Sequence, residues 1–311
     1  MIATVAIALF FSLRNATLLH TWSVASALLI ALPAAALANW FPGPRLAYLA
    51  GPPATGAAGF YANALAITVS LVTPGRLFEA VKPAALKLQT GLPLMRGFVA
   101  VALERLLDVG CLALLAVIAA SAAAAQYADG LRHGAFVMAA FLALGIVFLA
   151  VLWARPEFMR RVVDLLPFLW LRKVAGEMLD ALASAGSLPA LVVPAFYSVL
   201  TWAASYLAFL LLLGLAGGIP LTPGQVLFVF VVGTLGFVFT VTPGGLGTYE
   251  GALVLALGSL GYPLADGLAL AILLRIVFLL PTVAASAWFV TRGGLRFGDL
   301  NAHLGKGRGN T

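Results

Sequence analysis

Long apolar stretches separated by short polar connections make up most of the 311-residue chain. Several approach the roughly 20 residues that an α-helix needs to cross a bilayer, and they lack the alternation typical of barrel strands. The pattern therefore predicts an all-α, polytopic bundle of transmembrane helices with about seven to nine crossings or partial crossings. The expected segments lie at about 1–13, 21–39, 47–73, 97–125, 134–154, 189–217, 222–241, 248–260 and 265–290.

One order of helix-breaking and charged positions occurs twice along the chain. Val-Thr-Pro-Gly at 72–75 is followed by Glu79, a Gly-Leu-Pro turn and Arg105, and Val-Thr-Pro-Gly at 241–244 is followed by Glu250, a Gly-Tyr-Pro turn and Arg275. Paired interruptions of this kind point to a transporter site built from broken helices. We therefore expect two internal repeats, at about 47–125 and 222–290, that contain broken or re-entrant helices. The repeats are parallel or inverted depending on whether segment 248–260 crosses the membrane or dips and returns.

The stretch at about 156–187 is the only extended polar part of the chain. Its apolar residues recur at helical spacing with charged residues on the other faces, as expected for an amphipathic helix on the bilayer surface, and Pro167 is expected to break it. The sequence thus predicts a single membrane domain over 1–297, with this segment between the repeats, and a flexible cytoplasmic tail at 298–311.

Composition and charge support a membrane protein. The chain is 63% hydrophobic and 9% charged, with a mean hydropathy of +1.07, whereas a soluble domain carries roughly 25% charged residues. The net charge of +7 is better explained by basic loops on anionic lipid than by nucleic acid. Basic residues gather in three connections, and the positive-inside rule places all three in the cytoplasm, which suits a bacterial cytoplasmic membrane. Those residues are Arg76, Lys82, Lys87 and Arg96, then Arg155, Arg160, Arg161, Arg172 and Lys173, then Arg292, Arg296, Lys306 and Arg308.

Charged residues inside apolar helices are costly and mark functional sites. Glu104 and Asp108 share a helix face and Arg105 can pair with Asp108, whereas Arg275 needs a partner from another segment, with Glu250, Glu104 and Glu79 as the candidates. A proline-broken helix also exposes N–H groups that favour an anionic ligand. The alternative is a set of buried ion pairs and a helix-initiating acid that only hold the fold together. Asn63 and Tyr61 are further candidates for the same cavity.

We take the candidate substrate-binding residues to be those of the Pro-Gly elements together with the charges inside the apolar segments. They are Arg76, Glu79, Lys82, Glu104, Arg105, Asp108, Pro243, Gly244, Gly245, Gly247, Tyr249, Glu250 and Arg275. The single Cys111 and three scattered histidines offer no metal site, and no nucleotide-binding or intramembrane protease motif occurs, so we expect no cofactor.

The motifs at 74–83, 104–108 and 243–250, with Arg275 after them, resemble those of the lysylphosphatidylglycerol synthase transmembrane-region family, over roughly residues 55–290. The resemblance implies movement of an aminoacylated phosphatidylglycerol between leaflets, and related branches are linked to lipid-linked sugars or hopanoids. In the synthase branch a soluble transferase domain follows the membrane region, and because the chain stops about twenty residues after the last span, synthase activity is not expected here.

The sequence thus predicts a flippase-like protein whose partners are membrane lipids with anionic head groups, with a homo-oligomer allowed. The alternatives are a non-transporting membrane partner of a separate lipid-modifying enzyme, or an intramembrane lipid transferase that uses an acid such as Glu79 or Glu104.

Overall fold

The computed structural model describes residues 14–16, 21–73, 77–120, 125–184, 188–216, 218–238 and 242–292, and every regular element in these ranges is a helix. The all-α prediction is therefore confirmed for this part of the chain. The α-helices are α2 (Thr21–Trp40), α3 (Pro42–Ala50), α4 (Gly56–Ser70), α5 (Val81–Thr90), α6 (Leu94–Ala120), α7 (Ala125–Ala154), α8 (Pro156–Asp164), α9 (Leu169–Ser184), α10 (Val192–Ala216), α11 (Pro223–Val238), α12 (Thr248–Ser259) and α13 (Leu264–Thr291). The short 3-10 helices are η1 (Leu77–Ala80), η2 (Leu188–Leu191) and η3 (Pro243–Gly245).

Four of the described helical stretches are long and apolar enough to cross a membrane. They are Ser23–Ala50, Asp129–Ala154, Val192–Ala216 and Leu264–Thr291. Helix α6 has 27 residues, about 40 Å at 1.5 Å per residue, but carries the charged group at 104–108 in its middle. Four shorter helices, α4, α5, α11 and α12, form two hairpins.

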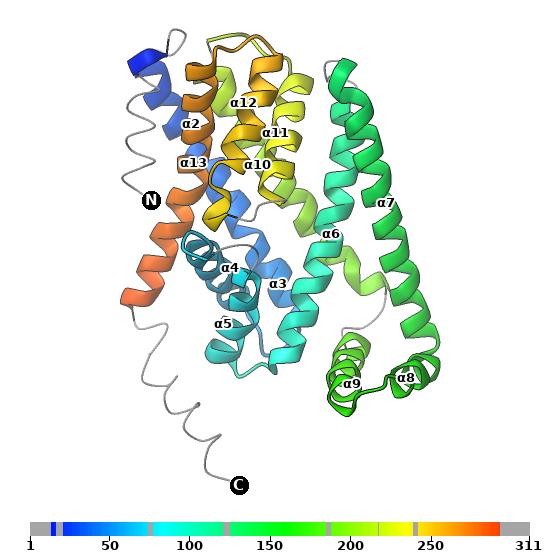
Figure 1. Cartoon of the computed structure of the whole chain (residues 1–311). Helices are drawn as coiled ribbons and strands as arrows, with labels where there is room; N and C mark the ends of the chain where they lie inside the picture. Colours follow the sequence, from blue (N-terminus) through cyan, green and yellow to red (C-terminus); the bar gives the residue numbers. More distant parts are fainter. Residues whose placement is uncertain are drawn as a thin grey trace.

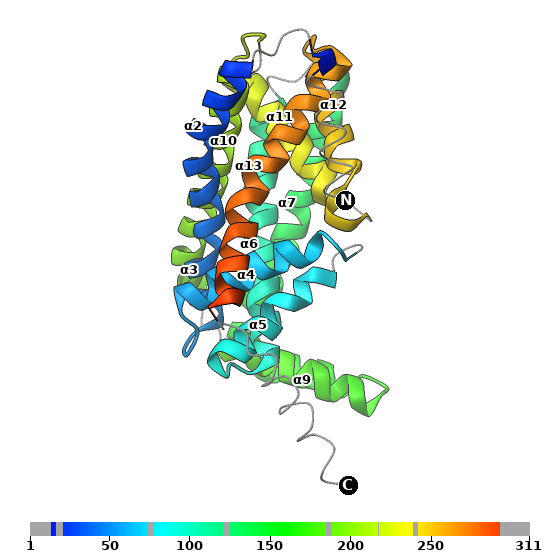
Figure 2. The same ribbon diagram turned by 90° about the vertical axis from the view of Figure 1, so that its left-hand side faces the viewer.

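The two hairpins approach each other from opposite ends of the bundle (Figures 1 and 2). Helices α4 and α5 form the first, which rises from the lower end in Figure 1, and α11 and α12 form the second, which descends from the upper end. Helix α12, at 12 residues, is about 18 Å long and is too short for a hydrocarbon core of about 30 Å. Helix α12 is therefore too short to cross alone and forms one arm of a hairpin with α11, and the two hairpins enter the bundle from opposite ends.

The hairpin tips meet in the middle of the molecule. A side chain added at Gly244, in the second tip, would place its Cβ 3.3 Å from Leu71, which follows α4 in the first. Each tip thus covers the other, and both lie far from the ends of the bundle in Figure 2. Backbone that is not helical is tolerated at this depth only where it is buried in protein or lines a cavity.

The turns after the hairpins also correspond. Gly91 and Gly261 end the returning helices with φ angles of 73° and 94°, a conformation that glycine adopts without steric cost. The long helices α6 and α13 then begin at Leu94 and Leu264, which have the same 170-residue separation as the two glycines. These features agree with a duplicated unit, although the duplication itself stays a prediction.

Two of the expected boundaries differ from the structure, and a third agrees with it. The apolar stretch at 47–73 is split, because Gly51 and the two prolines after it end α3 and a new helix starts at Gly56, so α2 and α3 together form one span. The connection expected between the segments at 97–125 and 134–154 is helical, since α7 begins at Ala125. The segment at 156–187 forms two helices, α8 and α9, which lie across the lower end in Figure 1 and are broken near Pro167, as expected.

The buried apolar side chains form two clusters. One contains residues of α2, α6, α7, α10, α11, α12 and α13 in the upper half of Figure 1. The other contains residues of α3, α4, α5, α6, α7 and α9 in the lower half. The charged residues of α6 lie where these two clusters meet. Expected segment 1–13, the Pro74-Gly75-Arg76 run and the tail at 298–311 lie outside the described residues.

Candidate functional site

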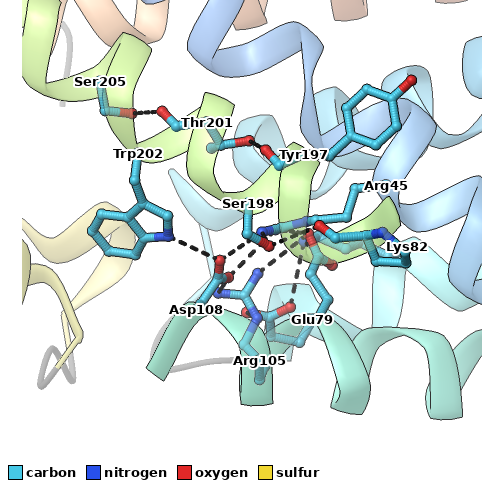
Figure 3. A network of polar contacts seen from close by, with 12 residues as sticks. Arg45, Glu79, Lys82, Arg105, Asp108, Tyr197, Ser198, Thr201, Trp202 and Ser205 are labelled. Atoms are coloured by element: carbon cyan, nitrogen blue, oxygen red, sulfur yellow. Dashed lines mark hydrogen bonds and ion pairs between the residues drawn. The ribbon is translucent and has the colours of Figure 1, made fainter. Parts of the chain in front are cut away.

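A network of charged side chains surrounds the middle of α6 (Figure 3). Glu104 and Asp108 lie one helical turn apart, and the guanidinium of Arg45, from α3, joins them. Its Nη2 donates to Glu104 Oε1 at 2.5 Å, and its Nη1 donates to Asp108 Oδ1 at 2.6 Å and to Ser198 Oγ at 3.0 Å. Charge-assisted bonds of this length are strong, and they fix α3 and α10 against α6.

The first hairpin enters the same network through Lys82. Its Nζ donates to Glu104 Oε2 at 3.0 Å and lies 3.9 Å from Glu79 Oε2. Lys82 and Glu104 are 2% and 1% exposed, so Lys82 is compensated by Glu104, and Glu104 by Lys82 and Arg45, and not by water. Removal of one partner would leave an uncompensated buried charge, which is costly.

Arg105 is held more loosely than the other two cations of the network, Arg45 and Lys82. Its side chain is 37% exposed, and its nitrogens lie 3.2 Å from Asp108 Oδ2, 3.5 Å from Glu79 Oε1 and 3.8 Å from Glu104 Oε1. Asp108 also accepts a hydrogen bond of 3.3 Å from the indole N–H of Trp202 on α10. Asp108 therefore has partners from three helices, α3, α6 and α10.

A second network lies at the tip of the other hairpin. Arg275, in α13, donates through Nε to Glu250, through Nη1 to the carbonyl oxygen of Gly244 at 2.6 Å and through Nη2 to that of Gly245 at 3.1 Å. The ring of Tyr249 lies 5.0 Å from the guanidinium carbon, at cation–π distance. The guanidinium is thus fully engaged in holding the turn that starts α12.

The backbone of this turn depends on its glycines. Pro243 starts η3, and Gly244, Gly245 and Gly247 have φ angles of 61°, 69° and 85°, in the left-handed region. Glu250 Oε2 accepts the N–H of Gly247 at 2.9 Å, so this carboxylate caps the first turn of α12. The role of helix-initiating acid, which the sequence left as an alternative for Glu250, is therefore present.

A cavity of about 300 Å³ connects the two networks. Its wall comes from α4 of the first hairpin, from α11 and α12 of the second, and from α2, α3, α6, α10 and α13. The charged and polar lining residues are Asn39, Arg45, Asn63, Glu104, Arg105, Asp108, Thr201, Ser205, Thr234, Tyr249 and Arg275, and the aromatic ones include Trp202, Phe209, Phe230, Phe237 and Phe278. A larger hollow of about 560 Å³ at residues 44–56 has no charged lining residue and is a weaker candidate for chemistry.

The structure brings most of the expected site residues to this cavity or next to it. The partner of Arg275 is Glu250, one of the three acids expected for it, and Asn63 lines the cavity. Tyr61 does not line it and instead stacks on Phe289, with ring centres 4.2 Å apart. Lys82, expected in a basic connection as well as in the site, is buried in the network. Arg76 lies outside the described residues.

Sequence reasoning missed Arg45. Its signal was available, because it is the only charged residue in the 28-residue span Ser23–Ala50. It stands in a Pro-Gly-Pro-Arg run that reads as a connection, although the run belongs to α3. Within the described ranges, no group of three His, Cys, Asp or Glu residues could hold a metal ion.

Comparison with known proteins identifies one family. A family model described as the lysylphosphatidylglycerol synthase TM region matches residues 1–286. No curated protein and no solved structure matches the chain. The family match begins well before residue 55, where the resemblance was expected to start, so it includes α2 and α3 and with them Arg45.

Proposed function

The chain belongs to the lysylphosphatidylglycerol synthase TM region family, and on that basis we propose that this integral membrane protein moves an anionic or aminoacylated phospholipid, or a related amphiphilic lipid, between the leaflets of a bacterial cytoplasmic membrane. The observation that supports the proposal is the cavity between the two hairpin tips, with an arginine-containing network on each side. Broken helices that meet around such a cavity are typical of transporters.

The size of the cavity suits a head group and not a whole lipid. At about 300 Å³ it lies at the lower end of the range for small-molecule sites. The acyl chains would stay outside, in contact with the bilayer, while the polar part of the lipid passes through the protein. This division removes the main barrier to lipid movement, which is the cost of taking a charged group through hydrocarbon.

The charges of the cavity suit a phosphate. Arginine presents a planar fork of donors that matches phosphate oxygens, and Arg45, Arg105 and Arg275 all reach the cavity wall. The carboxylates balance these arginines in the absence of lipid, so the cavity does not carry a large uncompensated charge. Aromatic side chains such as Trp202 and Phe230 supply apolar contact for the glycerol part.

The orientation follows from the basic residues. Arg160, Arg161, Arg172 and Lys173 belong to α8 and α9, which lie at the lower end of the bundle in Figure 1, as does the start of α6 with Arg96. The positive-inside rule then assigns the lower end to the cytoplasm. The first hairpin opens toward the cytoplasm and the second toward the outside.

Reconstitution into vesicles tests the proposal. The full chain is placed in phosphatidylcholine vesicles that contain fluorescent phosphatidylglycerol in both leaflets, and an impermeant reductant is added outside. We expect the inner-leaflet label, which is protected in protein-free vesicles, to become reducible. The Arg160→Ala protein should behave like the wild type, because Arg160 is an exposed surface residue paired with Asp180 at 2.9 Å. Protection equal to that of protein-free vesicles, with phosphatidylglycerol, its aminoacylated form and a lipid-linked sugar each used in turn, would contradict the proposal.

A further inference from the structure

Two arginines occupy corresponding places in the two halves of the bundle. Arg105 and Arg275 are 170 residues apart, and they follow the starts of α6 and α13 by the same number of residues. In each half the Nε atom of the arginine faces the acid that follows the hairpin tip. Arg105 Nε lies 3.5 Å from Glu79 Oε1, and Arg275 Nε donates to Glu250 Oε1.

The two guanidinium groups differ in their exposure and in the number of hydrogen bonds that they donate. Arg275 is 7% exposed and all three of its nitrogens donate hydrogen bonds within the second hairpin. Arg105 is 37% exposed, and its contacts to described residues are ion pairs of 3.2 to 3.8 Å. Among the arginines that line the cavity, Arg45 is 2% exposed and is bonded to two carboxylates. Arg45 Nε also lacks a hydrogen-bond partner, but the rest of that guanidinium is bonded and its side chain is buried. Among the described lining arginines, Arg105 is therefore the most exposed and the least firmly engaged, and it is the one best placed to bind a ligand.

The acids around Arg105 do not depend on it. Without Arg105, Asp108 would still accept hydrogen bonds from Arg45 at 2.6 Å and from Trp202 at 3.3 Å. Glu104 would still accept hydrogen bonds from Arg45 at 2.5 Å and from Lys82 at 3.0 Å. Glu79 keeps its contact with Lys82 at 3.9 Å. The guanidinium of Arg105 can thus turn from these acids to a ligand without leaving any of them alone in a buried site.

We propose that Arg105 binds the phosphate of the lipid head group, and that Arg275 is a positioning residue that holds the second hairpin and makes no contact with the phosphate in this state. This assignment rests on the proposed function and names the ligand group within the cavity. The bound phosphate would replace Asp108 and Glu79 as the partner of the Arg105 fork, and the wall formed by Trp202 and Phe230 would cover the adjoining glycerol.

The test measures how a short-chain lipid protects a cysteine inside the cavity. Ser205 lines the cavity and differs from cysteine by one atom, so Ser205→Cys is introduced together with Cys111→Ala, which removes the single native thiol. The purified full chain is labelled with a maleimide in detergent at increasing concentrations of dihexanoylphosphatidylglycerol. Dihexanoylglycerol, which lacks the phosphate, serves as the ligand control.

Each arginine is then replaced in this background. Arg105→Ala should raise the half-protecting concentration by about tenfold or more, the usual effect of losing a charge-assisted hydrogen bond. Arg105→Lys, which keeps the charge without the fork, should fall between the wild type and Arg105→Ala. Arg275→Ala should lower the unfolding temperature but change the half-protecting concentration by less than about threefold.

Arg160→Ala is the surface control and should change neither the unfolding temperature nor the half-protecting concentration. Thermal unfolding of each variant shows whether it is folded, and the Lys variant carries the test if Arg105→Ala is not.

Several outcomes would overturn the assignment. They are protection that is the same for the wild type and Arg105→Ala, an equal loss in Arg105→Ala and Arg275→Ala, and protection by dihexanoylglycerol that equals that of the phospholipid. Vesicle measurements on the wild type stay independent of this result. Lipid movement without an effect of Arg105 would leave the proposed function standing and remove the assignment, whereas a selective effect of Arg105 without lipid movement would do the reverse.

Discussion

The two hairpin tips use the same acid–arginine pair for different purposes. At the second tip, Glu250 and Arg275 stabilise a glycine-rich turn through hydrogen bonds to its backbone. At the first, Glu79 and Arg105 belong to a larger network in which Glu104 and Asp108 bind cations from α3, α5 and α6. One tip is thus fixed by bonds to its own backbone, and the other is connected to the rest of the bundle.

The sequence predicts two repeats, and this difference would let such a duplicated bundle carry an asymmetric site. The positions that match Glu104 and Asp108 at the 170-residue separation are Leu274 and Phe278, which are apolar. The extra carboxylates of the first half attract Arg45 and Lys82 into the core, and the balance of charge leaves Arg105 facing the cavity. The second half lacks these carboxylates, so its arginine bonds to carbonyl groups instead.

The largest expected effect is that of Glu104→Ala. The change leaves Arg45 and Lys82 buried without their shared carboxylate, so we expect a loss of about 3–5 kcal/mol in the free energy of unfolding. Denaturant titration of the protein in detergent measures this loss. Glu177→Ala, on the exposed face of α9, is the matched control and should change stability by less than about 0.5 kcal/mol. A loss below about 1 kcal/mol for Glu104→Ala would show that the first network is not what connects the hairpin to α6.

A somewhat smaller effect is expected at the second tip. Arg275→Ala removes the partner of Glu250 and two donors to backbone carbonyls, and we expect a loss of about 2–4 kcal/mol. Arg275→Lys restores the charge but not the fork, so it should recover about half of the loss. Equal unfolding temperatures for the Ala and Lys variants would mean that charge compensation has no part in holding this tip.

The smallest effects are expected at the turns that follow the hairpins. Gly91→Ala and Gly261→Ala each place a side chain at a positive φ angle with no heavy atom within 4 Å of the new Cβ, so the cost is backbone strain alone, about 1 kcal/mol. The two losses should agree within about 0.5 kcal/mol if the turns are equivalent. Gly176→Ala, inside α9 and with similar space, should be neutral or slightly stabilising, because alanine favours a helix. Clearly unequal losses at the two turns would argue against corresponding halves.

Much of this arrangement could be predicted from the sequence. Patterns of neighbouring residues predicted the helical class and the two Pro-Gly elements, and they placed Glu250 among the candidate partners of Arg275. These predictions were possible because broken helices and charges inside a membrane obey strong constraints. The meeting of Leu71 with Gly244 depends on how the hairpins pack, which no local pattern encodes. Arg45 was missed for a related reason. Its role in the network depends on two carboxylates about sixty residues away in the chain, and its own sequence surroundings look like a connection between helices.

The central claim is that a lipid head group passes through the cavity between the tips, and blocking that cavity tests it most directly. In the Cys111→Ala background, Ser205→Cys protein in vesicles is modified with a bulky maleimide, and movement of fluorescent phosphatidylglycerol is measured before and after. Ser26→Cys, an exposed position on α2 away from the cavity, is the matched control. We expect modification at Ser205→Cys to reduce the rate to that of protein-free vesicles and modification at Ser26→Cys to leave it unchanged. An unchanged rate after complete modification of Ser205→Cys would contradict the account.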